Sequence, residues 1–412
     1  MSQNQGPVPG RMFGVPKLGT TRRLVPDNGN ESLGASPSKG SQTKVQTTQF
    51  DQLDIVQGWK LPCTLTGKWT QGSGKTVHQS PFGIAASIQS LNVKLQAAYS
   101  TFNLNGPLAA LAQGYRPMWG SRTPSQDIAT TDPFAACQQV TVDGADHSYP
   151  FTVDIPAAIK IDEYYNLTAS GDPQQRIMDA IVSPFYMAAQ ARNVTPSLYL
   201  NPMMATADAL EAPTTIAVND NTSVFADGAF LAGLWRDSYF TSNNVEANPI
   251  QYPWLYTRDM FTQATQGQNK VGILIQNTAT SVGQVLSLWG FVWDPDANSG
   301  FGALVPFSSI ATFEFVTGGT LQNRYLTPQV LENDMFTRHP ELATLGPWAN
   351  GAGAFLLDFA MSTDGAYLTN ANAINTYVTN GVALNIVFNN GQAPGPNATV
   401  YVGVEALKLV TS

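Results

Sequence analysis

The sequence predicts an all-β fold of two jelly-roll β-sandwiches in tandem, a double jelly roll, with loop and helix insertions and an extended N-terminal arm. Three observations predict it. Apolar and polar residues alternate along strand-length stretches in both halves of the chain. Only 12% of the residues are charged, against 35 Gly and 27 Pro, which favours a turn-rich β protein that covers much of its surface with neighbours. The length of 412 residues exceeds what one core usually serves.

The three closing strands give the clearest pattern. They are expected at residues 354–361, 382–389 and 399–410. In the second stretch Leu384, Ile386 and Phe388 share one face, as in a strand that is half buried against a core. In the third stretch the alternation slips at Leu407, which indicates a bulge or a switch of sheet.

Shorter stretches of the same alternation predict the other strands. In the first half these strands are expected at residues 59–70, 91–95, 140–142, 151–155, 197–200 and 229–239. In the second half they are expected at residues 270–276, 284–293 and 311–316. Between strands we expect a short helix or turn at residues 80–88, an irregular passage at 96–137 and a helical segment at 174–192. A helix is expected at 327–336, because Thr327 is a good N-cap and Pro328 suits the first helical position. Each half thus carries about six to eight strands, as a jelly roll requires.

The chain is expected to divide into an N-terminal arm at residues 1–52, a first jelly roll at 53–243 and a second at 244–412. The arm shows no strand-length alternation and is rich in Gly, Pro, Ser and Gln, which is typical of an extended segment. Its basic residues are Arg11, Lys17, Arg22, Arg23, Lys39 and Lys44. A basic arm on an acidic body is expected to contact a neighbouring subunit, lipid head groups or nucleic acid, with a solvated tail as the alternative. Deleting residues 1–45 is predicted to leave the fold intact and to impair assembly.

Charge, cysteine content and hydropathy limit the function classes. The net charge of -8 argues against a body that coats nucleic acid, since phosphate binding needs clustered Lys and Arg. Cys63 and Cys137 lack nearby Cys or His and are expected to pack in a core instead of forming a disulfide framework. The N-terminus lacks the apolar region of a signal peptide, and no apolar run approaches the roughly 18 residues of a membrane span. The protein is therefore expected to be soluble and made in the cytosol of the cell that produces it.

Two loops suggest ligand sites but fail on spacing. Residues 72–76 (GSGKT) suggest a phosphate loop, but Trp69 stands where that motif needs glycine, so a hairpin turn is favoured. Residues 294–300 place oxygen ligands at alternate positions, as a calcium loop does. Val305 then occupies the position of the bidentate Glu, which favours a turn at a strand end.

No catalytic set emerges, and neither a cofactor nor a metal ion is expected. His78, His147 and His339 lie far apart, without the spacing of a zinc site and without a nucleophile elbow for a hydrolase triad. Asp162 and Glu163 are adjacent, so a strand would point them to opposite faces and not into one carboxylate pair. The protein is expected not to be an enzyme.

Several stretches, taken in order along the chain, carry a family resemblance. The first are residues 55–59 (IVQGW) and 80–95 (SPFGIAASIQSLNVKL); the next are 151–156, 182–190 (VSPFYMAAQ) and 194–200. The last are the closing segments AFLLDFA, ALNIVFNN and TVYVGVEALKL. Together they resemble the major capsid proteins of the tectivirus-like, adenovirus-related lineage, which have the double jelly-roll fold.

The resemblance implies a structural protein of the virion of a prokaryotic virus, a bacteriophage. Two upright β-sandwiches per chain and three chains per capsomer would give a pseudo-hexagonal block that tiles an icosahedral shell over an internal membrane. The implied partners are the chain itself, as a homotrimer and in neighbouring capsomers, and the minor capsid, penton or membrane proteins of the virion. Lipid is implied as a further partner of the arm, and no specific nucleic acid is implied. The Gly- and Pro-rich arm departs from the helical arm of some relatives.

Two other classes of function remain as alternatives. A virion spike or a carbohydrate-binding β-sandwich protein would use tryptophans as a sugar platform, and the candidates are Trp235, Trp254, Trp289 and Trp293. Aromatic anchors in a core or a subunit interface are the more common use of such residues. A secreted polysaccharide-acting enzyme is disfavoured by the missing signal peptide and the missing acid–base pair.

Overall fold

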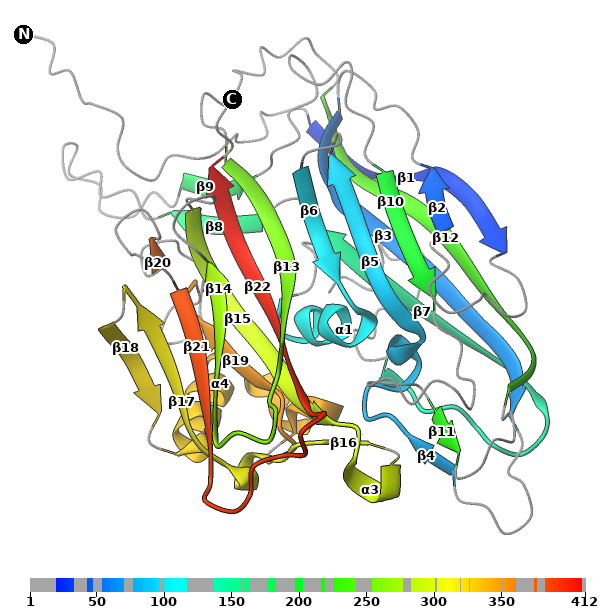
Figure 1. Cartoon of the computed structure of the whole chain (residues 1–412). Helices are drawn as coiled ribbons and strands as arrows, with labels where there is room; N and C mark the ends of the chain where they lie inside the picture. Colours follow the sequence, from blue (N-terminus) through cyan, green and yellow to red (C-terminus); the bar gives the residue numbers. More distant parts are fainter. Residues whose placement is uncertain are drawn as a thin grey trace, which may run out of the picture.

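The computed structural model describes most of the β framework of the chain. It describes residues 20–32, 43–46, 54–69, 77–95, 99–116, 137–156, 159–163, 177–182, 197–202, 216–218, 225–241, 254–276, 283–300, 302–318, 320–325, 327–349, 351–360, 374–375 and 382–409. The two groups of strands lie side by side in Figure 1, with helix α1 between them.

The second half of the chain forms a jelly roll of eight strands. These are β13 (Trp254–Ala264), β14 (Lys270–Gln276), β15 (Gly283–Asp294), β17 (Ile310–Thr317), β18 (Thr320–Tyr325), β19 (Phe355–Asp358), β21 (Val382–Phe388) and β22 (Thr399–Leu409). One sheet has the order β13–β22–β15–β19 and the other has the order β14–β21–β17–β18. Counted along the chain, the eight strands have the order 1-8-3-6 in the first sheet and 2-7-4-5 in the second. This arrangement of eight strands in two sheets is that of a jelly roll.

The first half repeats this plan strand for strand. Its strands are β1 (Thr20–Ser32), β2 (Thr43–Gln46), β3 (Asp54–Trp69), β5 (Ile88–Leu95), β6 (Tyr99–Leu104), β7 (Asp146–Pro156), β10 (Ser197–Pro202) and β12 (Phe225–Thr241). The sheets have the orders β1–β12–β3–β7 and β2–β10–β5–β6. In both halves the first strand neighbours the eighth, which neighbours the third. The fold is therefore a double jelly roll.

Strands β1 and β2 lie within the stretch that the sequence analysis assigned to the arm. Residues 20–32 pair antiparallel with β12, and residues 43–46 pair with β10. Neither strand was predicted, because neither alternates cleanly in sequence, and the pairing of β1 is itself interrupted by register shifts around Asn28.

A short parallel ladder joins the two jelly rolls into one sheet. Strand β6 of the first pairs with β13 of the second at Arg258↔Phe102 and Asp259↔Asn103. The result is a ten-stranded sheet that runs through both halves.

Shorter elements connect the strands. They are β4 (Val77–Gln79), β8 (Ile159–Glu163), β9 (Ile177–Val182), β11 (Ile216–Val218), β16 (Ala303–Leu304), β20 (Ile374–Asn375), α1 (Gly106–Tyr115), α3 (Ala297–Gly300) and α4 (Pro328–Arg338). The 3-10 turns are η1 (Gly83–Ser87), η4 (Phe307–Ser309), η5 (Pro340–Thr344) and η6 (Gly346–Trp348). The expected helix at 327–336 is confirmed as α4, with Pro328 in its first turn. Thr327 occupies the N-cap position, but its side chain makes no capping hydrogen bond.

Three sequence expectations were wrong. Residues 140–142 form no strand. The passage 96–137, expected to be irregular, contains β6 and α1, whose small apolar residues show no helical periodicity because every side of the helix is buried. The segment 174–192, expected to be helical, contains strand β9. The GSGKT turn at 72–76 lies outside the described residues.

The closing strands confirm their predicted faces. Along β21, buried and half-buried residues alternate, with Leu384, Ile386 and Phe388 facing the core. The slip at Leu407 coincides with a bulge, one of the two expected causes, but the bulge is in the neighbouring strand and not in β22. Strand β22 pairs regularly with β13 up to Leu409, and the bulge lies opposite, in β15 between Val285 and Ser287.

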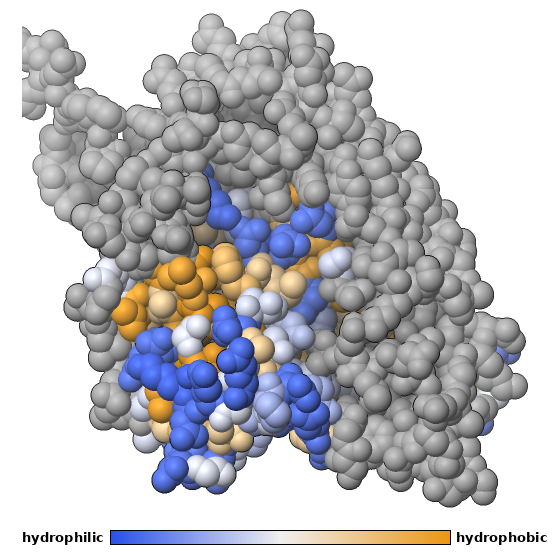
Figure 2. Space-filling view, viewed as in Figure 1, coloured by the Kyte–Doolittle hydropathy of each residue, from blue (hydrophilic) through white to orange (hydrophobic). Residues whose placement is uncertain are grey.

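Polar and apolar residues separate along the second jelly roll. Figure 2 shows hydrophilic residues at its lower end, where the β13–β14 and β21–β22 turns lie, and hydrophobic residues higher up. Gln266 and Gly391 adopt positive φ in these two turns. The end of the sandwich that carries these two turns is therefore polar.

Candidate functional site at the junction of the two jelly rolls

Strands β15 and β22 are buried on both faces, because one face lies in the core of the second jelly roll and the other meets the first jelly roll. We call this contact region the junction. On one face of β22, Val400, Val402 and Val404 pack into the core between the two sheets of the second jelly roll. The other face, which carries Gly403 and Glu405, turns toward α1 and the first jelly roll. Strands covered on both faces have nearly continuous apolar sequences, as GQVLSLWGFVW and TVYVGVEALKL do.

Helix α1 fills the space between the two jelly rolls. Asn105 caps it, since its Oδ1 accepts a hydrogen bond from the Leu108 amide at 2.9 Å. All ten residues of the helix are buried. Gly106 allows close packing on η1, because a Cβ there would lie 1.9 Å from the Ala85 carbonyl oxygen. The helix belongs to a hydrophobic cluster that draws on both halves of the chain.

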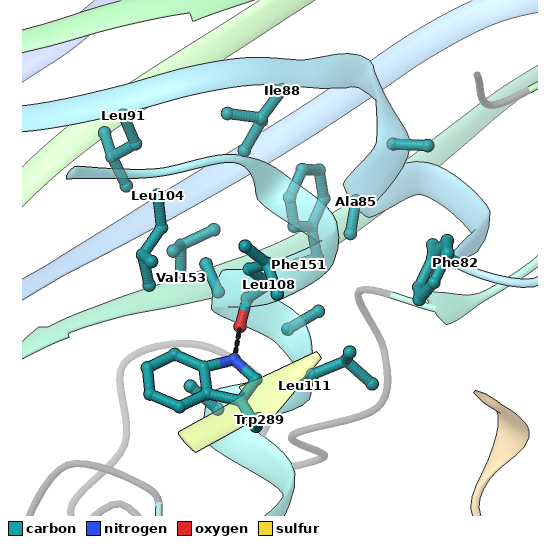
Figure 3. Close-up of a cluster of buried hydrophobic side chains, with 14 of the residues drawn as sticks. Phe82, Ala85, Ile88, Leu91, Leu104, Leu108, Leu111, Phe151, Val153 and Trp289 are labelled. Carbon is teal, nitrogen blue, oxygen red and sulfur yellow. Dashed lines mark hydrogen bonds between the residues drawn. The ribbon is translucent and has the colours of Figure 1, made fainter. Parts of the chain in front are cut away.

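Trp289 of β15 ties the second jelly roll to this helix. Its Nε1 donates a hydrogen bond to the Leu108 carbonyl at 2.9 Å, as Figure 3 shows. The indole lies flat against β22, where a Cβ on Gly403 would come within 2.3 Å of the ring. Trp289 is fully buried, so it anchors the junction and cannot serve as a sugar platform.

A buried group of polar and charged side chains lies beside the helix. This junction cluster consists of Tyr115, Arg116, Tyr256, Arg258, Ser287, His339, Asp358 and Glu405, each at most 6% exposed. Its members come from the end of α1, from β13, β15, β19 and β22, and from the end of α4. The cluster therefore connects the insertion of the first jelly roll to the framework of the second.

Glu405 is the acceptor at the centre of the cluster. Arg116 Nη1, Tyr256 OH and Ser287 Oγ all donate to its carboxylate, the last at 2.9 Å. Arg258 Nη2 approaches the same carboxylate at 3.2 Å and also donates to the backbone carbonyl of Arg116 at 3.1 Å. Four donors thus surround one buried carboxylate, which satisfies a charge that would otherwise be costly to bury.

Asp358 forms the second acidic centre. Arg116 Nη2 donates to its two carboxylate oxygens at 2.6 and 2.5 Å, and His339 Nε2 lies 2.9 Å from Oδ2. The Ala360 amide donates to Oδ1 at 3.0 Å. Arg116 therefore bridges the two acidic centres, and the fork of its guanidinium suits that role better than a lysine would.

The protonation states follow from these contacts. Burial would raise the pKa of Asp358, but Arg116 and the hydrogen bond with His339 outweigh it and hold the pKa below its usual range. Burial would lower the pKa of Arg116, but Asp358 and Glu405 raise it further above its ordinary value. Burial raises the pKa of Tyr256, so its phenol keeps its proton and can donate. The cluster is a closed network of paired charges and not an exposed acid–base set.

The sequence analysis did not single out any junction residue for this role. It considered His339 only as a possible metal ligand or catalytic base. A signal was present at Glu405, which interrupts the apolar stretch that was expected to form the last strand, whereas the strand that carries Arg258 was not predicted. A charge inside a strand that is buried on both faces needs a partner, but the sequence does not say which one.

The other candidate residues fall elsewhere. Arg22 and Arg23 lie in β1, opposite Tyr239 and Ser238, and Lys44 lies in β2, opposite Tyr199. Arg11, Lys17 and Lys39 lie outside the described residues. These positions do not test whether the residues contact lipid or another subunit.

The candidate calcium-loop and thiol residues make contacts that stabilise the fold. Asp294 accepts hydrogen bonds from the amides of Asp296 and Gly395, so the supposed calcium loop fastens the turn before β22. Within the described ranges, no group of three or more His, Cys, Asp or Glu residues is placed to hold a metal ion. Cys63 lies in the core and Cys137 packs against it, as expected.

Within the part of the chain that the structure describes, no helix is both long enough and apolar enough to span a bilayer.

Comparisons with known proteins give a likeness of fold. No family model matches the sequence, and no curated protein matches it. A crystal structure of the STIV major capsid protein (MCP) matches with a TM-score of 0.50 and 11% identity, over 94% of this chain and 97% of that one. The capsid of the virus PBCV-1 matches with a TM-score of 0.51 and 9% identity, over 97% and 96% of the two chains. The atomic structure of Sulfolobus Turreted Icosahedral Virus matches with a TM-score of 0.50 and 10% identity, over 95% and 91%. The capsid proteins in these structures are double jelly rolls, and this chain shares their fold over almost its whole length.

Proposed function

We propose that this chain is the major capsid protein of an icosahedral virus, a structural subunit and not an enzyme. The observation that carries the proposal is the repetition of one eight-strand plan in two jelly rolls that share a sheet and a buried junction. The likeness to viral capsid structures over more than nine-tenths of the chain supports it. The closed junction cluster favours a rigid building block over a binding or catalytic site.

We further propose how the subunit assembles. Two similar jelly rolls per chain give six similar units in a homotrimer, and such a capsomer is pseudo-hexagonal and can tile a shell. The proposed partners are neighbouring capsomers and the minor capsid, penton or membrane proteins of the virion. The proposed location is the virion capsid, over an internal membrane, after synthesis in the cytoplasm of a prokaryotic host.

The domain division and the arm also remain proposals. We propose that the two jelly rolls divide near residue 243. The basic residues Arg11, Lys17, Arg22, Arg23, Lys39 and Lys44 are proposed to contact lipid or neighbouring subunits. Of these residues, Arg22 and Arg23 lie in the described strand β1 and Lys44 lies in β2.

The solution mass of the purified protein tests this proposal. Three chains of 44.2 kDa give a trimer of about 133 kDa, and light scattering should find that species or larger shells built from it. Electron micrographs of the same sample should show pseudo-hexagonal particles. A monomer at every concentration that binds strongly to a glycan array would instead favour the carbohydrate-binding alternative. Within the described side chains, Trp289 and Trp293 are buried and give that alternative no platform.

A further inference from the structure

The histidine at the end of α4 faces a carboxylate with each of its ring nitrogens. His339 Nε2 lies 2.9 Å from Asp358 Oδ2, and Nδ1 lies 3.7 Å from Glu341 Oε1. The ring is buried, with 1% of its side chain exposed. A neutral imidazole carries a proton on one nitrogen only, whereas the charged ring carries a proton on both. Only the charged form of His339 therefore presents a proton to both carboxylates.

Among the described residues, two carboxylates and one guanidinium lie around the ring. The groups that face it are Asp358 on β19, Glu341 on η5, Arg116 after α1 and the Tyr115 ring, whose centroid lies 5.7 Å from that of the imidazole. Arg338, next to it on α4, is paired with Asp334 at 3.1 Å. Arg116 is already paired with Asp358 and Glu405, whereas each ring nitrogen of His339 faces a carboxylate. The acidic groups on both sides of the ring favour its protonated form.

The segment that begins at this histidine closes one side of the junction core. Leu342 on η5 and Trp348 on η6 are buried in the same hydrophobic cluster as Leu108 and Leu111 of α1. Glu341 is the charged residue that connects η5 to the ring, and it is partly exposed to solvent. Loss of the His339 proton would leave the Glu341 carboxylate opposite an unprotonated nitrogen lone pair.

We propose that one proton on His339 latches residues 340–348 onto the junction, so that this segment covers the junction core when the ring is charged and separates from it when the proton leaves. The device belongs to the single chain and acts whether or not the chain assembles. Its chemical input is the external pH, and its output is the exposure of Leu342 and Trp348.

The direction of the pH effect follows from the pKa. Burial lowers the pKa of His339, but the hydrogen bond with Asp358 and the nearby Glu341 carboxylate raise it above its ordinary value. A group whose pKa is raised in the folded state adds stability that is fully present below its unfolded pKa and is lost as the pH rises through the folded pKa. The latch is therefore closed in mildly acidic solution and opens on the alkaline side of the ordinary histidine range.

Nuclear magnetic resonance of the histidine ring protons tests the first half of the proposal. The chain has three histidines, so replacing His78 and His147 in turn assigns the signals. We expect His339 to titrate above about 6.5, the ordinary value for histidine, and the variant Glu341→Gln to lower its midpoint. A His339 midpoint at or below about 6.5, or one that Glu341→Gln does not move, would overturn the proposal.

Hydrogen exchange tests the second half. After correction for the pH dependence of intrinsic exchange, residues 340–348 should lose protection as the pH rises through the His339 midpoint. In His339→Gln they should be unprotected throughout, and in the matched control His147→Gln they should behave as in the wild type. If His339→Gln does not fold, Glu341→Gln decides, because opening should then begin at lower pH. Equal protection of 340–348 on both sides of the midpoint would show that the proton holds nothing.

Discussion

Replacing Glu405 by Gln should be among the most damaging single-atom changes in the described core. The change keeps the shape of the side chain but removes the charge that Arg116 and Arg258 share. The two guanidinium groups then have only Asp358 as a buried counter-charge, since Glu341 is partly exposed. Removing one partner of a buried charge network typically costs about 3–5 kcal/mol.

The expected change in melting temperature follows from the size of the chain. An unfolding entropy of about 2.1 cal/mol/K per residue over 412 residues amounts to about 0.9 kcal/mol/K. Glu405→Gln should therefore lower the melting temperature by about 3–6 °C in scanning calorimetry. The matched control is Glu314→Gln, which breaks an ion pair with Lys270, whose side chain is 55% exposed, and should shift it by about 1 °C or less. Equal shifts in the two variants would refute the view that the Glu405 charge holds the junction.

Three further changes probe the junction, the N-terminal strands and the acid limit. Gly403→Ala forces a methyl group against the Trp289 ring and should cost about 1–3 kcal/mol in urea unfolding, and a neutral result would mean that the indole does not lie on β22. Deleting residues 1–45, which the sequence predicted to leave the fold intact, removes β1 and most of β2 and should instead destabilise the first jelly roll; an unchanged melting curve would show that these strands carry no stability. The pKa of Asp358 is lowered in the folded state, so its contribution is present above its unfolded pKa of about 3.9 and is lost as the pH falls toward the folded value. Asp358→Asn should flatten that acid loss in a pH series of melting temperatures, and an unchanged slope would assign it to other carboxylates.

The sequence predicted the double jelly roll where a strand has one buried face. Residues 382–388 are the best case, because the polar Asn385 between Leu384 and Ile386 shows which side meets the core. The prediction failed for a helix that is buried on every side and for an irregular strand. Helix α1 has no polar face from which a period can be read, and β1 is interrupted by bulges.

The junction cluster could not be read from the sequence for a different reason. Arg116 and Glu405 are 289 residues apart, and their pairing depends on how the two jelly rolls dock. Local patterns report burial and secondary structure but not which distant charge lies opposite. The isolated charge of Glu405 within an apolar strand was the available sign that such a partner exists.

The ladder between β6 and β13 also decides how a subunit carries mechanical load. Pressure on one jelly roll reaches the other through backbone hydrogen bonds that continue across the ten-stranded sheet, and not through side chains alone. This crossing is only two residue pairs wide, so it is the narrowest point on the route. Under tension the two jelly rolls should therefore separate first at that crossing. Under compression the buried helix α1, which is packed between them, should resist their approach.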